Sequence, residues 1–295
     1  SAREHNSVTV RCKCVYKHKF SDNGSDVTGY KCRYTYCGSG ECPYPQWHGS
    51  SAPVTYYDGE TAPPDAPNST PTKGSYDARR TSSPVAYASS HRFILCHAAA
   101  NSRVLRCYDV RAAYLNAPDP SDRPTYMWPP NGMASYDANG EPHVWKVNTN
   151  IYGKAAASRA WHVVHAQGLL DLFPGNDSWH CAQSTADPCV FSFTKTADGQ
   201  QTGSIVLSAH VDDGLYSATD HALADEFAAA LSAKWECTHS PATAFLGCDI
   251  IDLTDEASGR RIVGLSQAKY IEELGAKFDQ LDCDAVTNPL IDRKS

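Results

Sequence analysis

The stretch of residues 204–218 constrains the fold of this chain more than any other. One apolar, β-forming run ends at Val211, a second begins at Leu215, and Asp212-Asp213-Gly214 lies between them. Because Asp-Gly is a strong tight-turn signal, the pattern predicts a β-hairpin with two adjacent carboxylates at its tip. An ordinary polar turn is one interpretation. Apolar strands rarely deliver two carboxylates together unless cations meet them, so a metal site is the other.

A metal site at this tip would need a third carboxylate. Side chains alternate across a strand, so we expect Asp212 and Asp213 to point to opposite faces, with only Asp212 pointing straight into a site. Two divalent ions require at least one further carboxylate from elsewhere in the chain. Asp109 ends a short apolar run that begins near Val104, and it is the candidate. We therefore predict that Asp109, Asp212 and Asp213 converge.

The composition is that of a globular protein. The chain has 295 residues, 41% of them hydrophobic and 20% charged, and contains no apolar run long enough to cross a membrane. Residues 1–30 show no signal-peptide pattern, and the twelve cysteines are expected to be mostly free and buried in a reducing compartment. The net charge of −7 disfavours nucleic-acid binding. Residues 1–35, however, hold seven Lys and Arg against three Asp and Glu.

Several local patterns organise the rest of the chain. Residues 8–36 alternate as a basic β-hairpin, and the Pro-, Gly- and Ser-rich residues 37–80 are expected to form a long loop or disordered insertion outside the core. A helix capped by Ser89 or Ser90 should run up to the Asp109 strand, and residues 221–235 have helical spacing. A zinc site is an alternative for part of the insertion, although its spacing is unusual; its ligands would be Cys32, Cys37, Cys42 and His48.

Two motifs resemble the reverse transcriptases of copia-type LTR retrotransposons. Residues 107–116, Cys-Tyr-Asp-Val-Arg-Ala-Ala-Tyr-Leu-Asn, are similar to the family's Asp-Val-x-x-Ala-(Phe/Tyr)-Leu-Asn, and residues 210–213 to its x-Val-Asp-Asp. The resemblance covers about residues 10–36 and 80–290 in colinear segments. The other segments are 12–19 with 30–33, 81–100, 124–132, 152–161, 184–193, 245–250, 265–274 and 288–290.

The resemblance implies an α+β fold of the right-hand polymerase type, with an antiparallel palm sheet, fingers and a partial thumb. It places fingers at residues 8–105, palm at 106–119, fingers again at 120–150, palm at 151–252, and the start of the thumb or connection at 253–295.

The implied activity is RNA-directed DNA polymerisation, in which two Mg²⁺ or Mn²⁺ ions assist nucleotidyl transfer to a DNA primer on an RNA or DNA template. The metal ligands carried over are Asp109 and Asp212 as the primary pair, Asp213 as a weaker one, and Val110. Lys31 or Arg33 would neutralise the incoming triphosphate, and Tyr114 would exclude a ribose 2′-OH. Residues packing at the nascent pair and at the primer end would be Tyr152, Gly153, His210, Phe245, Leu246 and Gly247.

Some positions depart from the family pattern. His210 replaces the usual tyrosine, Ser158 replaces a proline, Lys154-Ala155 inverts the usual Leu-Lys order, and residues 37–80 do not align. A catalytically silent or domesticated relic that binds nucleic acid or has a structural role is therefore an alternative. An unrelated metal-dependent nuclease or phosphatase is another.

The implied partners are RNA or DNA template, DNA primer, deoxynucleoside triphosphates, and the RNase H and integrase regions of a parent polyprotein, with no membrane. The implied location is intracellular, in cytoplasmic virus-like particles or the nucleus.

Overall fold

The computed structural model describes residues 9–10, 12–20, 27–36, 82–119, 125–129, 133–140 and 143–278. Helices and mainly antiparallel sheets occur together, which confirms the α+β class. The strands are β1 Thr9–Val10, β2 Cys12–Phe20, β3 Val27–Tyr36, β4 Val104–Val110, β5 Thr125–Met127, β6 Trp145–Val147, β7 Trp179–Gln183, β8 Val190–Ala197, β9 Gln200–His210, β10 Asp213–Ala218, β11 Cys237–Pro241, β12 Ala244–Phe245, β13 Cys248–Thr254 and β14 Arg261–Ser266. The helices are α2 Ala88–Ala100, the short 3₁₀ helix η3 Ala113–Asn116, α3 Ala157–Leu170, α4 His221–Lys234 and α5 Ala268–Lys277.

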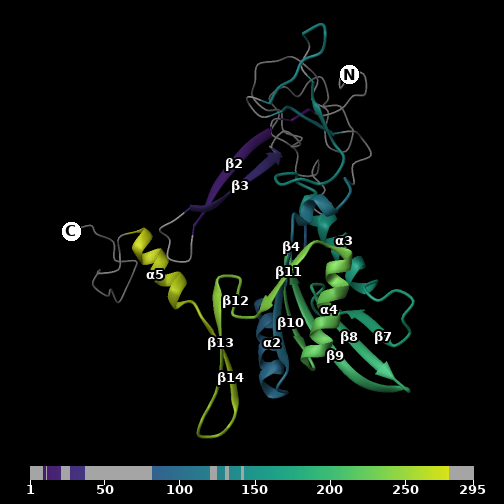
Figure 1. Ribbon diagram of the computed structural model, residues 1–295, viewed down its shortest axis with the longest axis vertical. Coiled ribbons are helices and arrows are strands. Elements are labelled where there is room, and N and C mark those ends of the chain that lie inside the picture. The colour runs from purple at the N-terminus through teal and green to yellow at the C-terminus, as the bar shows by residue number, and fades with distance from the viewer. Residues whose placement is uncertain are drawn as a thin grey trace, which may run out of the picture.

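A six-stranded antiparallel sheet in the order β11-β4-β10-β9-β8-β7 is the largest sheet of the described residues, and we call it the central sheet (Figure 1). Its middle strands are buried on both faces, which explains why residues 205–218 lack a clean polar–apolar alternation. The register brings β4 and β10 side by side although they are far apart in sequence, with Asp109 opposite Asp213. The predicted strand over residues 184–193 begins only at Val190, because Asp187 and Pro188 form a turn in which the Val190 N–H donates to the Asp187 carbonyl.

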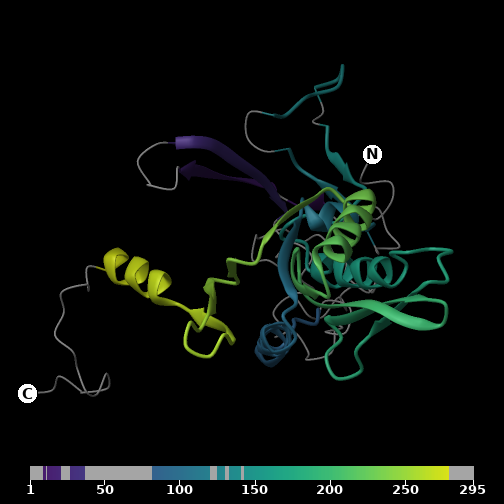
Figure 2. The same cartoon turned by 60° about the horizontal axis from the view of Figure 1, so that its bottom comes forward.

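Helices α3 and α4 cover one face of this sheet (Figures 1 and 2). Helix α4 confirms the helix predicted over residues 221–235, and its buried positions Leu223, Phe227 and Leu231 recur every four residues toward the sheet. The Asp220 side chain caps the helix by accepting a hydrogen bond from the Leu223 N–H at 2.8 Å. In α3, Trp161 is fully buried in the same core.

Helix α2 and the β12–β13–β14 sheet lie on the opposite face, with a second core of their own. The helix predicted before the Asp109 strand is confirmed, but its predicted cap is wrong: α2 begins at Ala88, and neither Ser89 nor Ser90 is its N-cap. The carboxylate of Asp187, which is far away in the sequence, contacts the start of the helix instead. It accepts hydrogen bonds from the Tyr87 N–H at 2.9 Å and the Ser90 hydroxyl at 2.5 Å.

Two extensions leave the central sheet (Figure 2). The first is the β2–β3 hairpin, which confirms the hairpin predicted over residues 8–36 and pairs Cys12 with Tyr36. Of its side chains, only those of Arg33 and Thr35 are described. The second runs through β13 and β14 to α5, which confirms the helix expected near residues 265–274. The insertion at 37–80, its Cys and His residues and the 288–290 segment lie outside the described residues.

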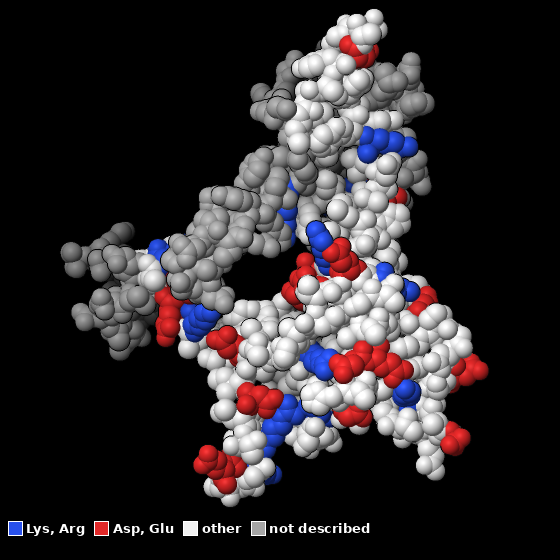
Figure 3. Space-filling model, viewed as in Figure 1, with Lys and Arg blue, Asp and Glu red and all other residues white. Residues whose placement is uncertain are grey.

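The six cysteines whose side chains the structure describes are free, as predicted, but only Cys107 and Cys189 of these six are buried. Cys96 is exposed because it lies on the outer side of α2, opposite the buried positions Ile94, Leu95 and Ala98. None of the helices in the described part of the chain is long and apolar enough to cross a membrane. Acidic and basic side chains are interspersed on the visible face in Figure 3.

Candidate active site

The turn between β9 and β10 lies earlier in the sequence than predicted. His210 pairs with Asp213, so the two turn residues are Val211 and Asp212, and Gly214 is inside a strand. Gly214 is needed for close packing rather than for a turn. A Cβ atom at this position would lie 2.2 Å from the Tyr108 ring, which crosses over the strand. The Asp-Gly pair correctly predicted a hairpin, but Gly214 is required by the close approach of Tyr108 and not by the turn.

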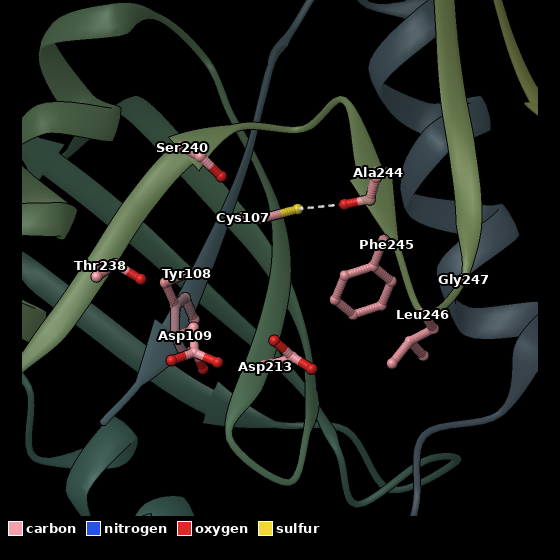
Figure 4. Close-up of a pocket in the computed structure, with 10 residues that line it drawn as sticks. All are labelled: Cys107, Tyr108, Asp109, Asp213, Thr238, Ser240, Ala244, Phe245, Leu246 and Gly247. Atoms are coloured by element: carbon pink, nitrogen blue, oxygen red, sulfur yellow. Dashed lines mark hydrogen bonds between the residues drawn. The ribbon is translucent and has the colours of Figure 1, made fainter. Parts of the chain in front are cut away.

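This shift reverses the expected placement of the two adjacent carboxylates. Asp213 starts strand β10 directly opposite Asp109, so both side chains lie on the same face of the sheet. Asp212 reaches that edge from the turn. The prediction that only Asp212 points straight from a strand into the site is therefore wrong. Figure 4 shows the Asp109 and Asp213 side chains at the same side of one pocket.

The three carboxylates influence one another electrostatically. Partial burial, followed by the charges of Asp212 and Asp109, raises the pKa of Asp213 to about 6. The same negative charge reaches neighbouring groups: burial and then Asp213 raise the pKa of the Cys107 thiol to about 12. Burial and Asp109 raise the pKa of Cys237 to about 11. A field that disfavours additional negative charge is one that a cation would stabilise.

Two hydrogen bonds from outside the hairpin fix the turn that carries Asp212. The Val110 N–H donates to the Asp212 carbonyl at 2.8 Å, and the Trp161 indole N–H donates to the Val211 carbonyl at 2.6 Å. Val110, one of the predicted metal ligands, is buried at the end of β4. Among the described residues, no group of three or more His, Cys, Asp or Glu side chains is close enough to form a ready-made metal cage.

A pocket of about 240 Å³ opens beside Asp109 and Asp213. The β12–β13 turn closes its other side (Figure 4). Phe245, Leu246 and Gly247, predicted to support a primer end, therefore lie across the pocket from the carboxylates. Leu246 and Gly247 both have positive φ, at 49° and 75°, as a two-residue hairpin turn requires. The complete lining is Cys107, Tyr108, Asp109, Asp213, Thr238, Ser240, Ala244, Phe245, Leu246 and Gly247.

A second group of predicted residues gathers around Tyr152. Arg33 lies over the Tyr152 ring, with its guanidinium carbon 4.5 Å from the ring centre, and the Tyr114 ring centre is 5.0 Å from that of Tyr152. Burial raises the pKa of Tyr152, Arg33 lowers it, and Asp212 and Asp109 are among the charges that raise it. This aromatic and cationic group therefore lies within the field of the carboxylates.

The two residues that follow Tyr152 fix the conformation of its loop. Gly153 has φ of 90°, which only glycine adopts readily, and the Lys154 ammonium is buried in an ion pair with Asp119. The Lys31 side chain lies outside the described residues, although its backbone pairs with Lys17 in the β2–β3 hairpin. The sequence thus identified the group at Tyr152, and the structure adds the buried ion pair beneath it.

Comparison with known proteins identifies the family. The family model described as reverse transcriptase (RNA-dependent DNA polymerase) matches residues 71–292. This match covers most of the chain. The chain belongs to the reverse transcriptase family.

Curated relatives place this reverse transcriptase among the copia-type retrotransposons. It is similar to the retrovirus-related Pol polyprotein from transposon TNT 1-94 of Nicotiana tabacum, at 30% identity over 70% of this chain and 14% of the relative. It is also similar to those from transposons RE1 and RE2 of Arabidopsis thaliana. For RE1 the identity is 30%, over 72% of this chain and 13% of the relative. For RE2 it is 26%, over 96% and 16%. The chain thus spans only about a sixth or less of these polyproteins, and no solved structure matches it.

Some residues near the candidate site were not predicted from the sequence. His91 of α2 lies between Phe245 and His210, with ring centres 5.0 Å and 6.3 Å away, so a second histidine borders the predicted primer contact. His165 lies four residues after Trp161, and their rings stack at 4.7 Å. That spacing of four residues, which places two side chains on one face of a helix, was the available signal. For His91, nothing in the sequence indicated the contact, since it joins three separate elements.

Proposed function

We propose that this chain extends a DNA primer on an RNA or DNA template by nucleotidyl transfer, as the polymerase region of a copia-type Pol polyprotein. The observation that supports this most strongly is the placement of the three aspartates. Asp109 and Asp213 face each other across adjacent strands, and Asp212 lies in the turn beside them. The raised pKa of Asp213, about 6, reflects burial and then the charges of Asp212 and Asp109.

The residues present fit a magnesium site of the kind completed by substrate. Mg²⁺ prefers carboxylate oxygens, keeps several waters, and is usually held by one or two carboxylates together with substrate phosphates. The absence of a complete cage among the described residues is consistent with this mode of binding. Asp109 and Asp212 would hold the ions, with Asp213 as a weaker ligand. Mg²⁺ or Mn²⁺ bound there would supply Lewis acidity to the primer 3′-OH and neutralise charge on the leaving pyrophosphate.

The residues around Tyr152 would bind the incoming deoxynucleoside triphosphate. Arg33 extends from the β2–β3 hairpin over Tyr152 and provides a cation near the carboxylates, where a triphosphate would carry its charge. Lys31 is proposed for the same role on the basis of sequence alone. Tyr114 is the proposed sugar gate: its hydroxyl is hydrogen-bonded to Ser158 Oγ at 3.0 Å, which fixes the ring direction. A fixed ring can exclude a 2′-OH by steric clash.

The opposite side of the pocket would receive the primer end. Phe245, Leu246 and Gly247 form a hairpin turn facing the carboxylates, and His210 pairs in register with Asp213. Burial lowers the pKa of His210, although Asp212 opposes this shift. A neutral imidazole has one donor and one acceptor, so His210 can replace the hydrogen-bonding capacity of the tyrosine expected from the family pattern.

These roles support the proposed assignment of palm to the six-stranded sheet, fingers to the β2–β3 hairpin with α2, and the start of a thumb to α5. The nucleic-acid partners follow from the family. The relatives are named as Pol polyproteins, which supports a polyprotein context, and association with RNase H and integrase regions is proposed from the family resemblance.

Primer extension tests this function. The full chain, Mg²⁺ and a homopolymer RNA template with a DNA primer should give extended product. Asp109→Asn and Asp212→Asn should each reduce the rate by at least about a hundredfold, because each removes a metal-binding charge. A matched control is Asp198→Asn. Asp198 is also an aspartate in a two-residue turn of the same sheet, between β8 and β9, but at the other end of β9.

Loss of extension in both site variants with retention in the control would support the proposal. A folded parent chain that extends no primer with Mg²⁺ or Mn²⁺, on RNA or DNA template, would contradict it and favour the silent relic.

A further inference from the structure

The turn that carries Asp212 has a strained backbone. Val211 has φ of 57°, in the left-handed region, at the first of the two turn residues. This conformation costs about 1–2 kcal/mol for most residues, and it is a genuine outlier for a β-branched one. Such strain persists only when surrounding groups determine the conformation.

Two donors from outside the hairpin bind the turn's carbonyl groups. The Val110 N–H on β4 bonds the Asp212 carbonyl at 2.8 Å. The Trp161 indole N–H on α3 bonds the Val211 carbonyl at 2.6 Å. The Val211 carbonyl belongs to the peptide unit that joins Val211 to Asp212, so this second bond fixes the orientation in which the Asp212 backbone leaves the turn.

The Trp161 ring cannot readily move away from this position. It is 1% exposed, stacks on His165 at 4.7 Å with 13° between the planes, and meets Trp235 edge-on at 5.8 Å. His165 Nε2 in turn lies 3.2 Å from the Tyr108 hydroxyl, and Tyr108 lies over Gly214. An indole nitrogen can only donate, so the buried N–H of Trp161 would lose its partner if the turn relaxed.

We propose that Trp161 is a positioning residue for the carboxylate site: its indole N–H holds the strained Val211–Asp212 peptide so that Asp212 faces Asp109 and Asp213. It does not touch substrate itself. This inference rests on the proposed function for its catalytic consequence, but the conformational claim stands on the hairpin alone.

Trp161→Phe tests the hydrogen bond while keeping an aromatic ring. Loss of one such bond should lower kcat by about tenfold with little change in the KM for deoxynucleotide, because the substrate contacts remain. Trp235→Phe is the matched control. Trp235 belongs to the same buried cluster and is 7% exposed, but among the described residues no hydrogen bond joins its indole to the hairpin. A comparable loss of kcat in Trp235→Phe would overturn the assignment.

A double-mutant cycle with Val211→Gly separates positioning from general packing. Glycine adopts positive φ without strain, so the turn should hold its shape with less help. Trp161→Phe should then reduce kcat by about threefold or less in the Val211→Gly background, against about tenfold in the parent. Equal losses in the two backgrounds would show that Trp161 acts only through packing.

Amide hydrogen exchange of the β9–β10 hairpin gives a readout that does not depend on polymerisation. In Trp161→Phe, exchange at the hairpin tip should rise by about tenfold, with little change there in Trp235→Phe. Unchanged exchange at the tip would overturn the positioning role. If the tip responds as expected but the parent extends no primer, only the proposed polymerase function fails.

Discussion

The two hairpin turns on either side of the pocket are held in different ways. The Val211–Asp212 turn receives an outside backbone donor and an indole donor, and Tyr108 packs over the strand that follows it. The Leu246–Gly247 turn faces it across the pocket, but Leu246 is 42% exposed and a Cβ atom on Gly247 would meet nothing within 4 Å.

This difference matches the proposed roles of the two turns. Metal-binding carboxylates must be placed within a fraction of an ångström, so they need support from several elements. A turn that contacts a primer strand must admit that strand and let it move on after each addition. The contrast therefore predicts that changes near the first turn cost more than equivalent changes near the second.

The largest expected difference comes from adding one methyl group in the strand after the first turn and one in the second turn. In Gly214→Ala the new Cβ would lie 2.2 Å from the Tyr108 ring, so Tyr108 must shift and lose its contact with His165. We expect a loss of about 3 kcal/mol in the free energy of unfolding. Gly247→Ala meets no atom, and its cost of about 1 kcal/mol arises only from the positive φ. Urea denaturation of the two variants measures both values, and equal losses would remove the contrast.

Low pH should destabilise the fold around the Val211–Asp212 turn, because His165 is buried there. Burial, and then the charge of His162, lowers the pKa of His165 to about 3, so the folded chain keeps it neutral while the unfolded chain binds a proton near pH 6.5. The free energy of unfolding is therefore unaffected by this group above about pH 6.5. As the pH falls from there toward 3, it decreases by about 1.4 kcal/mol per pH unit.

Replacing the imidazole isolates this contribution. His165→Gln keeps a polar partner for the Tyr108 hydroxyl but cannot titrate in this range. Between pH 7 and pH 5, the free energy of unfolding should fall by about 2 kcal/mol less in the variant than in the parent. The exposed His221→Gln is the control and should follow the parent. Parallel curves for the parent and His165→Gln would contradict the account of this buried histidine.

Sugar selection gives a smaller expected effect. Tyr114→Val should admit ribonucleotides by a factor of about ten or more, since about 1.4 kcal/mol of discrimination corresponds to tenfold. Ser158→Ala removes the hydrogen bond that fixes the Tyr114 hydroxyl and should relax selection by about threefold. Tyr136→Val, at an exposed tyrosine outside the site, serves as the control. If Tyr114→Val rejects ribonucleotides as strongly as the parent in competitive incorporation assays, Tyr114 is not the gate.

The sequence was informative where local chemistry and family motifs agreed. The α+β class, the hairpin before residue 37, helix α4 and the approach of Asp109 to the Asp212-Asp213 pair were all predicted. The turn at Val211 was missed because an Asp-Gly pair is a stronger local signal than a β-branched residue. Tertiary contacts overrode that signal: Gly214 makes room for Tyr108, while Trp161 and Val110 stabilise a turn that local preference disfavours.

Other features joined segments that no local pattern could connect. Asp187 supports the start of α2 in place of a nearby serine, and His91 meets Phe245 and His210 from a helix far away in sequence. Contacts of this kind depend on the packed fold, so a single sequence cannot reveal them.

The ionisation of Asp213 tests the central claim, that the three aspartates form one cation-binding site, most directly. Carboxyl carbon NMR of the full chain should give an apparent pKa of about 6 for Asp213, raised by burial and by Asp212 and Asp109. Asp109→Asn and Asp212→Asn should each lower this pKa, and Asp198→Asn should leave it unchanged. Saturating Mg²⁺ should lower it in the parent, because a bound cation favours the carboxylate. An Asp213 pKa that responds to neither neighbouring substitution nor to Mg²⁺ would contradict the shared site.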